Sequence, residues 1–167
     1  MRRVLVTGGA GFIGSHFIRI LLAEEADAQV VNLDVLTYAG NLANLADVAS
    51  SPRYRFVRGD IRDMKVAQEL AADADWIVNF AAESHVDRST KARAGEFIDT
   101  NVYGAYVMLE ATRQVNRGAR FLQVGTDEVY GSLDWPSFPN EGALLCPSSP
   151  YSAARSRTSA ENFRDVS

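Results

Sequence analysis

The 167-residue chain predicts an α/β fold, a doubly wound parallel sheet with helices on both faces. Short apolar runs alternate with helix-like runs, which is the order of successive strand–helix–strand units. The apolar runs are continuous and do not alternate with polar residues, as expected of strands that are buried on both faces. In addition, a glycine-rich turn at residues 7–14 joins the first strand-like run to the first helix-like run.

The elements follow one another in order along the chain. The strand-like runs span residues 4–6, 30–33, 54–57, 76–80 and 121–124. The helix-like runs span residues 15–25, 63–72 and 101–115. Asp63 is expected to be the N-cap of the second helix. We therefore predict one Rossmann-type domain over residues 1–167, with a sheet that ends after about the fifth strand and leaves the domain incomplete at its C-terminal end.

The composition is that of a globular domain: 47% of the residues are hydrophobic and the net charge is -4. No basic stripe is interleaved with aromatic residues, so we expect no nucleic-acid partner. No apolar run approaches membrane-spanning length, and the run 4–6 is too short for a signal peptide, so we expect no membrane partner and a cytoplasmic location. The single cysteine, Cys146, excludes an intrachain disulfide and fits a reducing compartment.

The glycine-rich turn has the context of a dinucleotide-binding loop. Gly8, Gly11 and Gly14 allow a tight turn and let the backbone approach a pyrophosphate. Phe12 and Ile13 stand where the helix starts, and free N–H groups with the helix dipole favour a phosphate there. The alternative interpretation is a purely structural glycine turn.

Asp34 ends the second strand-like run. A carboxylate at this point accepts hydrogen bonds from ribose hydroxyls and repels a 2′-phosphate, which favours NAD over NADP. The alternative is a surface aspartate that caps the glycine turn.

Thr126, Asp127 and Glu128 open a long irregular stretch at the carboxyl end of the fifth strand-like run, the edge where open α/β sheets bind ligands. In extended chain the two carboxylates point to opposite sides, and in a partly dry cleft their repulsion lets one be protonated while the other is ionised. An acid and a base then coexist. The alternative is a solvated acidic turn.

Tyr151 and Arg155 are four residues apart and share a face if this segment is helical. A cation there stabilises a tyrosinate and favours Tyr151 as a base, and the alternative is a packing pair. No cluster of histidine, cysteine and carboxylate residues has the spacing of a metal site, so we expect no metal.

The helix-like run 101–115 is apolar on two sides, so it covers the sheet and something else. A second copy of the chain, forming a homodimer, and the chain's own loops are the two candidates. One stripe consists of Val102, Ala105, Tyr106 and Leu109, and the other of Tyr103, Val107 and Ala111.

Together these motifs resemble the extended short-chain dehydrogenase/reductase family, and within it the nucleotide-sugar 4,6-dehydratases that act on dTDP-glucose. The resemblance covers residues 1 to about 155, and its segments 34–42, 83–89 and 126–128 are more specific than the glycine loop. The matching segments are 7–14, 34–42, 59–61, 80–89, 100–104, 126–131 and 149–152.

The resemblance implies NAD as the cofactor and assigns its contacts. Beyond the glycine loop, those contacts are Asp34 at the adenosine ribose, Asp60 and Ile61 at the adenine, and Ala81 and Ala82 along the phosphate–ribose section. Leu36, Thr37, Tyr151 and Arg155 are further cofactor contacts.

The resemblance also implies the chemistry. Tyr151 would take the proton of the sugar 4-hydroxyl, with Thr126 bonded to the same oxygen. The C4 hydride would pass to NAD. Glu128 would then take the C5 proton, Asp127 would protonate the departing C6 hydroxyl, and the hydride would return to C6, so that the net reaction is loss of water. The substrate pocket would be lined by Ser84, His85, Val86, Asp87 and Arg88.

Two departures from the family stand out. Arg155 replaces the family's lysine, and arginine is bulkier and forked. The chain also ends at Ser167, so the nucleotide-sugar domain of the family is missing. We therefore weigh a catalytic lyase against a cofactor-binding remnant without turnover. Another nucleotide-sugar epimerase or dehydratase of the family is a third candidate, which Asp127 and Glu128 disfavour.

Overall fold

The computed structural model describes residues 1–84, 94–132, 139–140, 142–156 and 158. The chain divides into two compact units. The sheet unit comprises Met1–Ala81 and Gly104–Val124, and the helical unit comprises Ala82–Tyr103 and Gly125–Ser167. No helix in the described ranges has the length and apolar character needed to cross a membrane.

The sheet unit contains five parallel strands in the order β3-β2-β1-β4-β5. The strands are β1 (Arg2–Thr7), β2 (Ala28–Asp34), β3 (Tyr54–Arg58), β4 (Trp76–Asn79) and β5 (Arg120–Gln123). The chain winds outward from β1 to β3, returns, and winds outward through β4 to β5, so its direction reverses between β1 and β4. This confirms the predicted doubly wound, Rossmann-type sheet.

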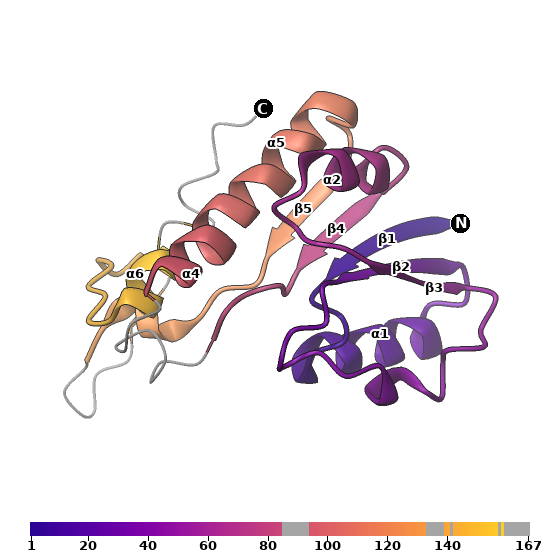
Figure 1. Cartoon of the computed structure of the whole chain (residues 1–167), viewed down its shortest axis with the longest axis horizontal. Helices are drawn as coiled ribbons and strands as arrows, with labels where there is room; N and C mark the ends of the chain where they lie inside the picture. The colour runs from indigo at the N-terminus through magenta and orange to yellow at the C-terminus, as the bar shows by residue number, and fades with distance from the viewer. Residues whose placement is uncertain (85–93, 133–138, 141, 157, 159–167) are drawn as a thin grey trace. The chain divides into compact units, whose positions relative to one another are not determined.

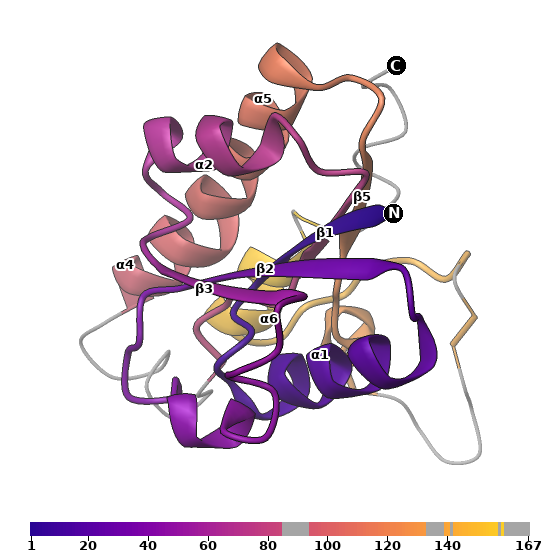
Figure 2. The same ribbon diagram turned by 90° about the vertical axis from the view of Figure 1, so that its right-hand side faces the viewer.

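Helices cover both faces of this sheet (Figures 1 and 2). Helix α1 (Phe12–Glu24) lies on one face, and α2 (Met64–Ala71) packs against α5 (Ala105–Val115) on the other. Successive β1 residues enter opposite layers: Val4 and Val6 join the core under α1, and Leu5 joins the core under α2 and α5. This alternation explains why the strands read as continuous apolar runs.

The first residues of α2 and α1 can be compared with the predicted N-cap and the predicted helix start. Asp63 is the N-cap of α2 as predicted, and its side chain accepts hydrogen bonds from the N–H groups of Lys65 and Val66. Helix α1 begins at Phe12, three residues before the predicted start, because the turn that follows Gly11 is already helical. A short 3₁₀ helix, η1 (Leu42–Leu45), follows β2.

The predicted helix 101–115 is wrong in its start and in its regularity. The helical region already begins with α4 (Ala94–Phe97) and continues through a π-helical segment, η2 (Ile98–Gly104), before α5. Within α5, Val107 and Ala111 from one of the two predicted apolar stripes are buried in the core.

The helical unit holds α4, η2 as far as Tyr103, the 3₁₀ helix η3 (Asp127–Tyr130) and α6 (Pro150–Ser156). Helix α6 packs against α4 and against η3. The small core between α4 and α6 consists of Phe97, Tyr151 and Ala154, with Val102 packed against it.

Candidate functional site

The glycine loop lies between β1 and α1 at the carboxyl end of the sheet. Gly8 has a φ of +69°, and its N–H donates to the Leu33 carbonyl at 2.9 Å. A Cβ on Gly8 would lie 2.6 Å from the nitrogen of Ala81, and one on Gly14 would lie 2.5 Å from the Gly8 oxygen. Only glycine fits at these positions, and without side chains the backbone of the loop can approach a ligand closely.

The start of α1 offers main-chain donors beside this loop. Gly11, the N-cap, provides no side-chain hydrogen bond to the first turn of the helix. The side chains of Phe12 and Ile13 are 88% and 64% exposed, so the first turn faces outward. Uncapped N–H groups at a helix N-terminus suit a phosphate, and the loop therefore fits the diphosphate of a dinucleotide.

Asp34 stands at the end of β2, next to the loop. Its carboxylate is buried, with Oδ2 accepting from the Ala10 N–H at 2.9 Å and Oδ1 accepting from the Leu36 N–H at 2.8 Å. Leu36 takes a left-handed φ of 58°, which is rare for leucine, and Thr37 after it is exposed. The carboxylate thus holds both the glycine loop and the bend that follows β2.

Asp60 and Ile61 follow β3 at the same end of the sheet. The Asp60 carboxylate binds the Arg62 guanidinium at 2.6 Å. Partial burial acts to raise the pKa of Asp60, but the hydrogen bonds from Arg62 outweigh it and lower that pKa below its ordinary value. The Ile61 side chain is buried in the core under α5, so its main chain is the part that can face a ligand.

A polar chain that the sequence analysis missed runs across the ends of β1, β4 and β5. The Thr7 hydroxyl donates to Asn79 Oδ1, and Asn79 Nδ2 donates to Gln123 Oε1 at 2.7 Å. The Ala81 N–H also donates to the Thr7 hydroxyl, at 3.3 Å. This chain fixes the end of β4 beside Gly8. Polar residues that end apolar strands were the signal for it in the sequence.

The acidic pair lies in the helical unit, in η3. The prediction of extended chain at Asp127 and Glu128 is wrong, because Thr126 caps a 3₁₀ turn there and accepts from the Glu128 N–H at 3.3 Å. Gly131, with a φ of +78°, ends the turn. Both carboxylates are exposed, so within the described part of the chain they are not enclosed in a dry cleft.

Tyr151 and Arg155 share α6, as predicted. Both are buried, and the Tyr151 ring meets the Phe97 ring edge-on at 6.3 Å between centroids. Burial lowers the pKa of the Arg155 guanidinium, and the nearby Tyr151 acts in the opposite direction. The helical unit therefore brings Tyr151 and Arg155 together with η3, which packs on α6.

The predicted substrate segment is only partly described. Ser84 is exposed, and Ala81 and Ala82 are half-buried. His85, Val86, Asp87 and Arg88 lie outside the described residues.

Gly9 lies in the glycine loop without being one of its three motif glycines. A Cβ there would contact the Asn32 side-chain oxygen and lie 2.5 Å from Cδ1 of Ile18. We expect Gly9→Ala to lower the free energy of unfolding by about 1–3 kcal/mol through overpacking, measured by urea denaturation. Gly118→Ala is the control, because its Cβ would meet only Asn116 Oδ1 at 3.7 Å. Equal stability of the two variants would contradict this account of the loop.

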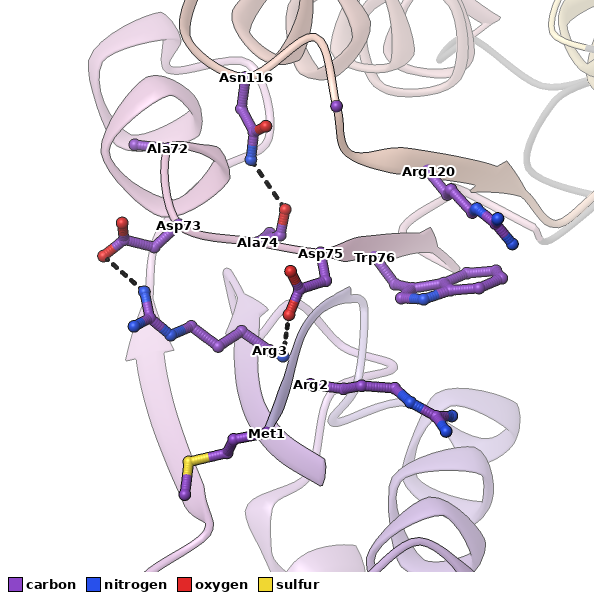
Figure 3. A pocket seen from close by; sticks show the side chains of 11 residues that line it. Met1, Arg2, Arg3, Ala72, Asp73, Ala74, Asp75, Trp76, Asn116 and Arg120 are labelled. Carbon is purple, nitrogen blue, oxygen red and sulfur yellow. Dashed lines mark hydrogen bonds and ion pairs between the residues drawn. The ribbon is translucent and has the colours of Figure 1, made fainter. Parts of the chain in front are cut away.

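A separate hollow lies at the amino-terminal ends of β1 and β4 (Figure 3). Arg3 bonds to two acidic residues of the lining: its guanidinium pairs with Asp73 at 3.2 Å, and its main-chain N–H donates to the Asp75 carboxylate at 2.7 Å. The Arg120 guanidinium lies 5.0 Å from the centre of the Trp76 ring. These pairings hold the strand ends together, and we assign no ligand to the hollow. It is lined by Met1, Arg2, Arg3, Ala72, Asp73, Ala74, Asp75, Trp76, Asn116, Gly118 and Arg120.

Comparison with known proteins gives consistent matches. The sequence model described as GDP-mannose 4,6 dehydratase matches residues 5–164. The Low-salt glycan biosynthesis protein Agl12 of Haloferax volcanii is 54% identical over 152 residues, which is 91% of this chain and 48% of that protein. A dTDP-glucose 4,6-dehydratase of an Actinoplanes species is 48% identical over 158 residues, which is 92% of this chain and 48% of that protein.

Solved structures agree. DesIV, a dTDP-glucose 4,6-dehydratase from Streptomyces venezuelae with NAD and TYD bound, matches with a TM-score of 0.86 and 53% identity over 92% of this chain and 48% of that chain. The UDP-Glc/GlcNAc 4-epimerase of Campylobacter jejuni matches with a TM-score of 0.87 and 27% identity over 99% of this chain and 49% of that chain. The chain thus spans about half the length of the relatives that it matches.

Proposed function

The chain belongs to the GDP-mannose 4,6 dehydratase family, and on that premise we propose that it is the NAD-binding half of a dTDP-glucose 4,6-dehydratase. In this proposal residues 1–167 form an NAD-binding Rossmann domain. The observation that carries it is the packing of η3, with Asp127 and Glu128, against α6, with Tyr151 and Arg155. The named dehydratases among the relatives support the same reaction.

NAD fits the donors of the sheet unit. Bound NAD supplies a reversible hydride acceptor, so that a net loss of water can pass through an oxidised sugar. The residues proposed to hold the diphosphate are those of the glycine loop, and Asp34 is proposed to hold the adenosine ribose. The remaining proposed contacts are Leu36, Thr37, Asp60, Ile61, Ala81, Ala82, Tyr151 and Arg155.

The proton transfers are assigned to the helical unit. Tyr151 takes the proton of the 4-hydroxyl, and the buried Arg155 cation stabilises the tyrosinate. Thr126 donates a hydrogen bond to the same sugar oxygen. Once C4 is a ketone, the C5 proton is acidic and passes to Glu128. Asp127 then gives a proton to the C6 hydroxyl, which leaves as water. The hydride removed from C4 would return to C6 and the proton held by Glu128 to C5, which gives the 4-keto-6-deoxy sugar.

A homodimer through α5, in a reducing, cytoplasmic compartment, belongs to the same proposal. Val107 and Ala111 face the core, whereas Tyr106 on the same helix is 56% exposed. An exposed aromatic side chain on a helix that already covers the sheet suits a second copy of the chain.

We expect NAD to bind about tenfold or more tightly than NADP, because Asp34 repels the 2′-phosphate. Calorimetric titration of the chain with both cofactors measures the ratio. Asp34→Asn removes the charge, keeps an acceptor for one of the two N–H groups, and should bring the two affinities together. Equal affinities in the unaltered chain would contradict the role of Asp34.

An assay of product formation distinguishes the proposed lyase from a cofactor-binding protein without turnover. The chain is incubated with NAD and dTDP-glucose, alone and with the separately purified C-terminal half of DesIV, and the 4-keto-6-deoxy product is assayed. Product formation supports the lyase. NAD binding without product in either mixture favours a cofactor-binding remnant, which the replacement of the family's lysine by Arg155 supports. Absence of NAD binding would refute both.

A further inference from the structure

The glycine loop is fixed to the end of β2 at three consecutive residues. The Gly8 N–H donates to the Leu33 carbonyl at 2.9 Å, and the Ala10 N–H donates to Asp34 Oδ2 at 2.9 Å. Gly9 lies between these two hydrogen bonds, and a side chain of β2 occupies the space that a Cβ on Gly9 would need. The middle contact of the three is therefore made by a side chain.

Asn32 is the residue that meets Gly9. Its side chain is 0% exposed, and its Nδ2 donates to the hydroxyl of Tyr54, on the neighbouring strand β3, at 3.0 Å. A Cβ on Gly9 would overlap Asn32 Oδ1 and would lie 2.7 Å from Asn32 Cγ. Because the amide nitrogen is bonded to Tyr54, the amide oxygen is the atom that faces the loop.

The Asn32 oxygen is buried and accepts no hydrogen bond from any residue that the structure describes. A buried acceptor without a donor lowers stability, and such groups are few in native proteins. A carbonyl oxygen is smaller than a methyl group, so asparagine lets the main chain of Gly9 lie closer to β2 than a leucine of the same branching would. The oxygen thus weakens the core but allows the loop to pack closely on the strand.

The Tyr54 hydroxyl accepts from this amide in its neutral form. Burial raises the pKa of Tyr54, the hydrogen bond from Asn32 acts to lower it, and the Asp34 charge raises it, so that it lies above its ordinary value. The hydroxyl is therefore protonated at neutral pH. It fixes the orientation of the Asn32 amide, since only the amide nitrogen can donate to it.

We propose that Asn32, oriented by Tyr54, is a positioning residue for the diphosphate of the cofactor. Its oxygen sets how closely Gly9 lies against β2, and through Gly9 it sets where the N–H groups of the loop point. The proposal rests on the proposed function, because it takes the glycine loop as the diphosphate site. Small displacements of such donors weaken their hydrogen bonds to a bound phosphate.

Asn32→Leu keeps the branching of the side chain and replaces both polar atoms by methyl groups. We expect the affinities for NAD and for ADP, measured by calorimetric titration, to fall about tenfold or more. Adenosine has no phosphate, so its affinity, followed by NMR titration, should stay within about threefold. Equal losses for ADP and adenosine would overturn the proposal, because a general loosening of the domain affects both ligands.

Tyr54→Phe tests the orientation of the amide. It should weaken ADP binding about threefold or more in the unaltered chain, and less than about twofold in the Asn32→Leu background, where no amide remains to be oriented. Circular dichroism checks that each variant is folded. Additive losses, or no loss in the unaltered chain, would contradict the role of Tyr54.

Asn116→Leu is the matched control for stability. Asn116 also lies in the sheet unit, and its side chain donates to the carbonyls of Ala71 and Ala74 at 3.0 and 2.8 Å. This variant should lower the midpoint of urea denaturation and keep ADP affinity within about twofold. A loss of ADP affinity equal to that of Asn32→Leu would show that lost stability, and not the position of the loop, weakens binding.

Hydrogen exchange of the Gly8 and Ala10 amides tests the positioning without any ligand. Both should exchange slowly in the unaltered chain and about tenfold or more faster in Asn32→Leu. If neither NAD nor ADP binds the unaltered chain but this protection depends on Asn32, the proposed function fails and the hold of Asn32 on the loop stands. Equal exchange in the two proteins would overturn the positioning role whatever the affinities.

Discussion

Replacing Gly8 by alanine is expected to weaken NAD binding about a hundredfold. The φ of +69° is a left-handed conformation that costs alanine about 1–2 kcal/mol. The new Cβ would also lie 2.6 and 2.7 Å from the nitrogen and Cα of Ala81, which are backbone atoms and cannot rotate away. Overpacking of this kind costs about 1–3 kcal/mol, so the loop leaves the conformation that presents its N–H groups.

Returning the loop to that conformation in the variant costs about 3 kcal/mol, which corresponds to about a hundredfold loss of affinity. Calorimetric titration with NAD measures the loss, and circular dichroism checks that the variant is folded. Gly118→Ala serves as the control, since its added methyl group meets only an ordinary contact. NAD affinity of Gly8→Ala within about threefold of the unaltered chain would show that the diphosphate does not use this loop.

Asp127→Asn is expected to stall the reaction after oxidation at C4. Asparagine keeps the shape of aspartate but cannot give a proton to the C6 hydroxyl, so dehydration should slow by about a hundredfold or more. Because Asp127 is exposed and the cap of η3 is the Thr126 side chain, the local fold should persist. The measurement needs a turnover-competent dehydratase that carries this chain as its amino-terminal half.

In single-turnover experiments, absorbance of the reduced nicotinamide should then rise and persist. Tyr151→Phe is the matched comparison, because it removes the base for the first step and should suppress the rise itself. Normal overall turnover of Asp127→Asn would remove Asp127 from the role of acid.

The order and type of the sheet elements could be predicted because each strand is recognisable from its own residues as a continuous apolar run. The apolar residues of β1 enter two buried layers, so the whole run is apolar, and no distant residue is needed to recognise it. The same holds for Asp63, whose cap depends only on the next three residues. The positions of the glycine loop and Asp34 followed from these elements.

The features that sequence reasoning missed depend on partners far along the chain. The π turn at Asn101 is tied to Glu83, and Asn79 is tied to Thr7 and Gln123 on neighbouring strands. A pattern of periods 2 and 3.6 contains no information about such pairs. The misassigned turn at Asp127 is different, because Thr126 followed by polar residues is a local capping signal that the extended interpretation overlooked.

The two main-chain hydrogen bonds of Asp34 have a consequence for the energetics of cofactor recognition. They are formed within the protein, so the entropy of ordering the bend at Leu36 is lost when the chain folds and not when a ligand arrives. A preorganised loop of this kind favours rapid association. It also means that neutralising Asp34 changes two quantities at once: discrimination against the 2′-phosphate, which appears in the ratio of the two affinities, and the order of the free loop, which weakens both equally.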